Sequence, residues 1–100
     1  MYGSTGSDKD LTGFQTFTYD EIKAAVDVAH HFGKRLAFHS YGPDGARDGV
    51  RAGVDSVEHA IDLDDTTLAE MAKRGTFYVL PLTITATMPT HGVNLVLTRS

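Results

Sequence analysis

Residues 35–59 read RLAFHSYGPDGARDGVRAGVDSVEH and contain two short apolar segments that each end in a histidine. Leu36–His39 and Val54–His59 have the length and apolar character of buried strands in a parallel sheet. The small residues between them predict a helix that begins near Pro43, packs closely against a sheet and ends at Gly53. The histidines are 20 positions apart, about one strand–helix repeat, so adjacent parallel strands would bring both imidazoles to the carboxyl edge of the sheet.

A helix is predicted before this segment. Thr18 and Glu21 form a capping-box pattern at its start, and Gly33 can end it in a left-handed conformation. His30 and His31 fall in its last turn, where we expect exposed histidines that suit the helix dipole.

Another helix and strand are predicted after the segment. The helix begins at Asp64 or Asp65 and ends at Gly75, and the strand covers Thr76–Leu80, which is rich in β-forming residues. Strands that alternate with helices over short connections predict an α/β fold with a parallel sheet.

Composition excludes several classes of function. The chain has 100 residues, enough for one small domain or part of a larger one. Its formal charge is −4 and it has no cluster of Lys and Arg, so we expect no nucleic-acid partner. It has no apolar run of the length that a membrane helix needs, so we expect no membrane association. It has no cysteine, which excludes a disulfide framework and a thiolate metal site and leaves the compartment open.

The histidine pair has two interpretations that the spacing leaves open. Neutral imidazoles at strand ends can share a divalent ion, or His39 and His59 can be structural residues that bond to the backbone. Glu58 directly precedes His59, so strict strand alternation predicts that its side chain points to the opposite face and is not a ligand. Tyr41 follows the first predicted strand, and for it, as for Tyr2 near the start of the sequence, we expect a packing or surface role rather than substrate contact.

Three segments of the sequence, in unbroken order, resemble the amidohydrolase superfamily, in the branch of imidazolonepropionase-like enzymes and metal-dependent Xaa-Pro dipeptidases. They are FTYDEIKAAVDVAH, GKRLAFHSYGPDGARDGVRAGVDSVEH and LDDTTLAEMAKRGTFYV. The resemblance implies part of a (β/α)8 barrel, about three βα units around strands 5 to 7. It also implies that His39 and His59 match the metal ligands that end the fifth and sixth strands.

The same resemblance implies a metal-dependent hydrolase of carbon–nitrogen bonds. The substrate would be a small molecule with an amide, cyclic amide or dipeptide bond, and the attacking group a hydroxide bound to a divalent metal, for which we expect zinc. The family also uses an HxH pair on strand 1, usually a carboxylated lysine on strand 4, and an aspartate on strand 8. None of these has a counterpart in the sequence, and the YGSTGS opening resembles the loop that follows strand 4.

Because these groups are missing, we expect the chain to be inactive on its own. One alternative function is therefore a non-catalytic truncated remnant or a small α/β metal-binding module. Another is a flavodoxin-like binding domain in which His39 and His59 are structural.

The resemblance divides the chain into a barrel fragment, residues 1–79, and a divergent tail, residues 80–100. No acidic residue follows Glu70, and residues 80–90 read LPLTITATMPT, where family members can continue with PTIDHNRYYAD. A nucleotide sequence that encodes the family segment gives LPLTITATMPT when it is read one base out of phase. We therefore hypothesise that a one-base deletion near Val79 shifted the reading frame.

Overall fold

The computed structural model describes Met1 and residues 15–60, 63–81 and 92–98. The elements alternate as predicted, and four strands form one parallel sheet in the order β1-β2-β3-β4. The elements are α1 (Tyr19–His31), β1 (Ala37–Ser40), α2 (Pro43–Ala52), β2 (Ser56–His59), α3 (Asp65–Arg74), β3 (Phe77–Pro81) and β4 (Asn94–Thr98). The α/β prediction is confirmed, with strand boundaries shifted by one or two residues.

The local signals at the helix ends act as the sequence predicts. Thr18 caps α1, and the reciprocal capping box with Glu21 is present. Asp64 caps α3, because its carboxylate accepts a hydrogen bond from the Thr67 amide at 2.7 Å. Gly53 and Gly75 end α2 and α3 in left-handed conformations, as expected for glycine at these positions.

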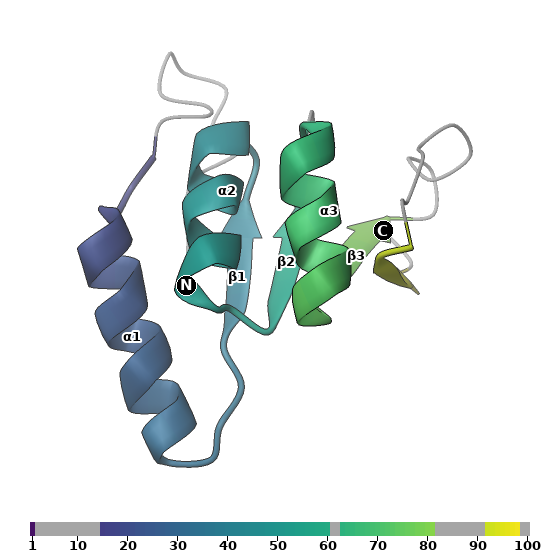
Figure 1. Cartoon of the computed structure of the whole chain (residues 1–100). Helices are drawn as coiled ribbons and strands as arrows, with labels where there is room; N and C mark the ends of the chain where they lie inside the picture. Colours follow the sequence, from purple (N-terminus) through teal and green to yellow (C-terminus); the bar gives the residue numbers. More distant parts are fainter. Residues whose placement is uncertain (2–14, 61–62, 82–91, 99–100) are drawn as a thin grey trace.

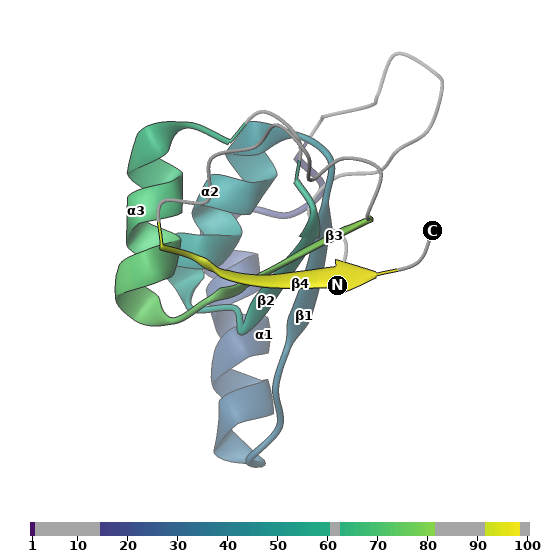
Figure 2. The same ribbon diagram turned by 90° about the vertical axis from the view of Figure 1, so that its right-hand side faces the viewer.

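The helices α1, α2 and α3 of the described residues lie on one face of the sheet (Figure 1; Figure 2). The core between the two layers is apolar and includes Ile22, Val26, Phe38, Val50, Val57, Met71 and Tyr78. On the other face, Phe77 and Val96 are 40% and 38% exposed. The chain therefore buries one side of its sheet much more completely than the other.

Close packing of α2 on β1 depends on a glycine. A Cβ atom at Gly49 would lie 2.7 Å from Cδ1 and 2.8 Å from Cε1 of the fully buried Phe38 ring. The prediction of a small-residue helix against a sheet is therefore confirmed in atomic detail.

The fourth strand was not predicted. Asn94–Thr98 pairs in parallel with β3, and β3 itself continues through Leu80 and Pro81. Both strands extend into the predicted tail, so the division at residue 79 stays a prediction. Residues 82–91 of that tail, and Tyr2 near the other end, lie outside the described residues. No helix within the described ranges is long and apolar enough to cross a membrane.

Candidate metal centre

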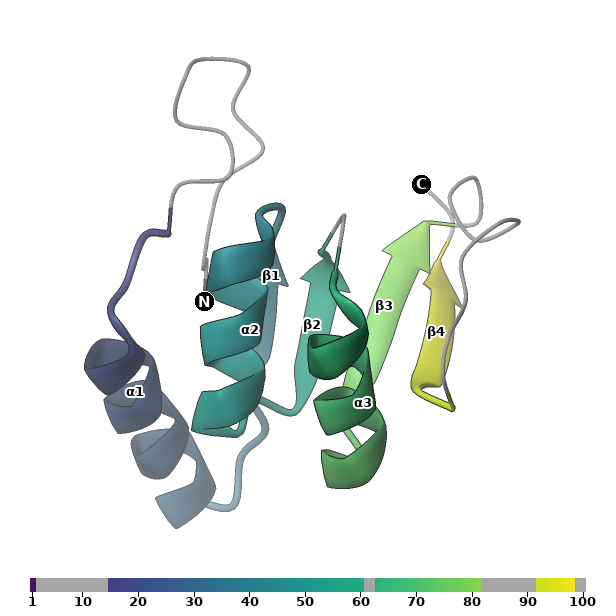
Figure 3. The ribbon, with the colours of Figure 1, turned by 45° about the horizontal axis from the view of Figure 1, so that its top comes forward.

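The two predicted histidines meet at the carboxyl edge of the sheet, where the arrowheads of β1 and β2 lie side by side (Figure 3). Nδ1 of His39 is 3.2 Å from Nε2 of His59, and the ring centroids are 5.3 Å apart. A pair separated by 20 positions in sequence is thus in direct side-chain contact. This juxtaposition is the one that the strand–helix spacing predicts.

The register of β1 and β2 adds Glu58 to the pair. His39 and Glu58 are Cα partners, so their side chains share the less covered face, while the neighbouring partners Phe38 and Val57 are fully buried against the helices. Oε2 of Glu58 lies 3.2 Å from Nε2 of His39. Both side chains are a little over a quarter exposed, at 27% and 28%, so the contact is partly shielded from water.

The expectation that Glu58 points away from His59 is wrong. His59 has a φ of 75° and Ala60 a φ of 30°, so the backbone leaves the extended conformation at the end of β2. Strand alternation does not hold across such a residue, and the ring of His59 turns back to the face that carries His39 and Glu58. One ligand atom from each of these three residues lies within 4.8 Å of the other two.

Hydrogen bonds hold this strained backbone in place. The Ala60 amide donates to the Ser40 carbonyl at 2.5 Å, and the buried Tyr78 hydroxyl donates to the Ala60 carbonyl. Left-handed conformations of non-glycine residues cost about 1–3 kcal/mol each and are concentrated at functional sites. The strain at His59 is therefore a second indication, independent of residue type, that this edge is functional.

Tyr41 supports His59 from the side. Its ring stacks on the His59 imidazole with centroids 4.7 Å apart and planes 7° apart. This contact agrees with the packing role expected for Tyr41, although the sequence did not identify its partner.

The donor set fits a divalent ion. Zinc binds imidazole nitrogen at about 2.0–2.1 Å, which places two tetrahedral ligand atoms about 3.3–3.4 Å apart. The separation of 3.2 Å between the facing nitrogens of His39 and His59 is close to that value. Two imidazoles and a carboxylate are also ligand types that zinc accepts.

A different cluster lies at the amino ends of the strands. The Asp55 carboxylate lies 2.8 Å from His30 Nε2 and accepts a hydrogen bond from the Leu36 amide at 2.7 Å. Partial burial, the largest single influence, raises the pKa of Asp55, but these hydrogen bonds and the charges of His30 and Arg35 together hold it below its ordinary value. His30 is exposed, as expected, but it also links α1 to the turn that precedes β2.

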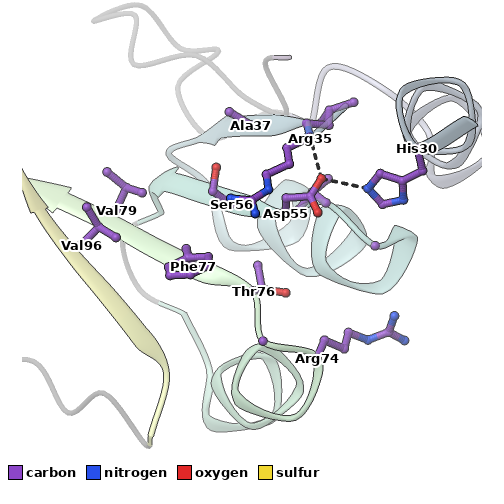
Figure 4. Close-up of a pocket in the computed structure, with 14 residues that line it drawn as sticks. His30, Arg35, Ala37, Asp55, Ser56, Arg74, Thr76, Phe77, Val79 and Val96 are labelled. Atoms are coloured by element: carbon purple, nitrogen blue, oxygen red, sulfur yellow. Dashed lines mark hydrogen bonds and ion pairs between the residues drawn. The ribbon is translucent and has the colours of Figure 1, made fainter. Parts of the chain in front are cut away.

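This cluster borders a pocket of about 790 Å³ (Figure 4). The close-up shows Arg35, Asp55 and Ser56 on one side, with Phe77, Val79 and Val96 across the sheet face. None of the pocket's lining residues belongs to the histidine cluster. The pocket and the candidate metal centre are thus at opposite ends of the strands.

Comparison with known proteins gives similar sequences and similar structures. No family model matches the chain. Uncharacterised proteins of Mycobacterium tuberculosis and Mycobacterium bovis are 40% identical over 60 residues, which are 60% of this chain and 16% of theirs. The chain thus spans about a sixth of the length of these curated relatives.

The similar solved structures are larger enzymes. A Xaa-Pro dipeptidase with methionine bound in its active site is 31% identical with a TM-score of 0.71, over 78% of this chain and 20% of that one. Aspergillus niger ochratoxinase is 29% identical with a TM-score of 0.72, over 78% and 19%. A prolidase in complex with N-methylphosphonate-L-proline is 27% identical with a TM-score of 0.73, over 91% and 23%.

These similarities confirm the predicted relationship and the predicted fold. The parallel sheet with helices on one face corresponds to part of the barrel of these proteins. The chain is similar to proteins of the amidohydrolase superfamily, and its sheet and helices correspond to a portion of their (β/α)8 barrel.

Proposed function

We propose that this chain contributes His39 and His59 as ligands of a divalent metal, with zinc as the expected ion, in a hydrolase of carbon–nitrogen bonds. The observation that carries the proposal is the 3.2 Å contact between the facing ring nitrogens of these residues at the carboxyl edge of parallel strands. Barrel enzymes assemble their active sites at this edge. The strained backbone at His59 and the stacked ring of Tyr41 support the same assignment.

The roles of the chain's own residues follow from their contacts. His39 and His59 would hold the ion, and Tyr41 would keep the His59 ring in its plane. A divalent ion held there would act as a Lewis acid toward an amide carbonyl. For the substrate we propose small molecules with an amide, cyclic amide or dipeptide bond. This proposal is supported by the similarity to a Xaa-Pro dipeptidase and a prolidase.

The alternative is metal binding without turnover. A catalytic zinc usually has three protein ligands and an open position for water. Among the described residues only His39, Glu58 and His59 form a candidate cluster, and a family site uses further groups from other strands. We therefore expect the 100-residue chain to take up zinc but not to hydrolyse dipeptides, and hydrolysis by this chain would contradict the non-catalytic alternative.

A chimera tests the enzymatic proposal. Residues 15–79 would replace the matching segment of the similar Xaa-Pro dipeptidase, and zinc content and dipeptide hydrolysis would be measured. The expected result is a chimera that binds zinc and is active, and that loses both properties with His39→Ala or His59→Ala. His31→Ala is the matched control, because His31 is an exposed histidine on α1 outside the cluster. Retention of zinc by the His39 and His59 variants, with altered stability alone, would favour structural histidines instead.

A further inference from the structure

We propose that Glu58 is a positioning residue that determines which ring nitrogen of His39 faces the metal. The inference rests on the proposed function of His39 and His59. It starts from the observation that the two nitrogens of His39 face different partners. Nδ1 is 3.2 Å from Nε2 of His59, and Nε2 is 3.2 Å from Oε2 of Glu58.

The chemistry of the two contacts assigns the proton. A neutral imidazole carries one N–H, and an ionised carboxylate can only accept a hydrogen bond. The proton of His39 is therefore assigned to Nε2, where Glu58 accepts it, and the lone pair to Nδ1, which faces His59. In the metal-free chain, Nε2–H of His59 donates to that lone pair, and an ion between the rings would take the place of this proton.

The same geometry argues that Glu58 is not itself a ligand. One imidazole offers a given ion a single nitrogen, and the nitrogen of His39 that faces His59 is Nδ1. Coordination through Nε2, on the Glu58 side, would direct the lone pair away from His59. A carboxylate that accepts the N–H of the ring nitrogen not bound to the metal commonly holds a metal-binding histidine in one orientation and tautomer.

Strand pairing fixes the position of Glu58 relative to His39. His39 and Glu58 are Cα partners on adjacent parallel strands, so the sheet hydrogen bonds set the distance between them. The side chain of His39 lies on the less covered sheet face and is 28% exposed. A neighbouring carboxylate can therefore supply the orientation that core packing does not.

The test uses the full 100-residue chain, with zinc affinity measured by calorimetry and the ring tautomer of His39 measured by ¹⁵N NMR without metal. Glu58→Ala should weaken zinc binding by about 10- to 100-fold, the usual cost of removing such a partner. Glu58→Gln, which keeps the shape and an acceptor oxygen, should weaken it less. Both substitutions should replace the single Nε2–H tautomer of His39 with a mixture.

Asp44→Asn is the matched control. It removes one negative charge at the same end of the sheet, from a side chain that is 68% exposed and pairs with Arg47. We expect it to leave the His39 tautomer unchanged and to alter zinc affinity less than twofold. If Asp44→Asn weakens binding as much as Glu58→Gln, then general electrostatics explain the effect and the positioning role is wrong.

The remaining outcomes separate this inference from the proposed function. If the chain takes up no zinc, or takes it up equally well with His39→Ala, the proposed function fails. If zinc uptake requires His39 and His59, but the Glu58 variants have the zinc affinity and the His39 tautomer of the parent chain, only the positioning role fails. If Glu58→Gln abolishes uptake as completely as His39→Ala while the His39 tautomer is unchanged, Glu58 is a direct ligand and the positioning role is overturned. Circular dichroism checks folding, and Glu58→Gln provides the test if Glu58→Ala does not fold.

Discussion

The ring of Tyr41 lies almost parallel to the imidazole of His59, with centroids 4.7 Å apart and an interplanar angle of 7°. Tyr41 directly follows β1, whereas His59 ends β2, so the stack joins the carboxyl ends of two neighbouring strands. The stack restricts rotation of a ring whose backbone already has a left-handed conformation.

We therefore predict that loss of the aromatic ring at position 41 weakens metal binding. Tyr41→Ala frees the His59 ring to rotate, and zinc affinity should fall several-fold. Tyr41→Phe keeps the stacked ring and should bind zinc within about twofold of the parent chain. Calorimetric titration of both variants tests this, and equal affinities for the alanine and phenylalanine variants would contradict the role of stacking.

A second prediction concerns Gly49. Alanine is favoured over glycine in a helix interior by about 1 kcal/mol, but overpacking of a core costs about 1–3 kcal/mol. The added Cβ would lie 2.7 Å from the fully buried ring of Phe38, so we expect the steric cost to exceed the gain. Gly49→Ala should therefore lower the free energy of unfolding by about 1 kcal/mol in urea denaturation.

The matched control for Gly49 is a double variant. Phe38→Leu destabilises the parent chain because it removes buried ring atoms, but in the Gly49→Ala background it also relieves the clash. The double variant should lose less free energy of unfolding than the two single variants lose together, by more than about 0.5 kcal/mol, as expected for residues in contact. Additive effects would show that the clash is absent.

A third prediction concerns the pH dependence that Asp55 contributes. Partial burial raises the pKa of Asp55, but the hydrogen bonds from His30 and Leu36 and the nearby positive charges lower it more, so the folded-state pKa lies below its ordinary value. A carboxylate of this kind stabilises the folded state above its unfolded-state pKa, and this contribution is lost as the pH falls through the folded-state pKa. Asp55→Asn should thus cost about 1 kcal/mol at pH 5, and the difference should shrink toward pH 2.

Urea denaturation at several pH values between 5 and 2 measures this difference. Asp27→Asn is the control, because Asp27 is an exposed carboxylate on the same helix as His30 and pairs only with Lys23 in the contacts of the described residues. We expect Asp27→Asn to change the free energy of unfolding only slightly, without the decrease toward pH 2 that is expected for Asp55→Asn. A constant cost of Asp55→Asn across the whole range would contradict the lowered pKa.

A fourth prediction concerns residues 80–100. If a one-base deletion near Val79 shifted the frame, the next reading frame of the gene should encode sequence like PTIDHNRYYAD after Val79 and should restore acidic residues. Sequencing of the gene tests this directly. Stop codons or unrelated sequence in that frame would contradict the hypothesis and leave residues 80–100 as a divergent tail.

The sequence by itself determined the order of elements and the identity of the central histidines. Local signals are sufficient for this purpose, because a capping box, a left-handed glycine or an apolar segment acts through residues close in the chain. Thr18, Gly53 and Gly75 end or begin helices where the sequence predicts. The spacing of His39 and His59 matched one strand–helix repeat, and the fold brings them into contact.

Only the tertiary structure decided how the site is built around that pair. Glu58 joins His39 because of the register between two strands, and His59 reaches them because hydrogen bonds to Ser40 and from Tyr78 stabilise a left-handed backbone. The contact of His30 with Asp55 and the pairing of β4 with β3 likewise join distant segments. These features depend on contacts between residues far apart in the chain. Local sequence patterns predict that side chains alternate along a strand, but they do not show where long-range packing changes the backbone and ends that alternation.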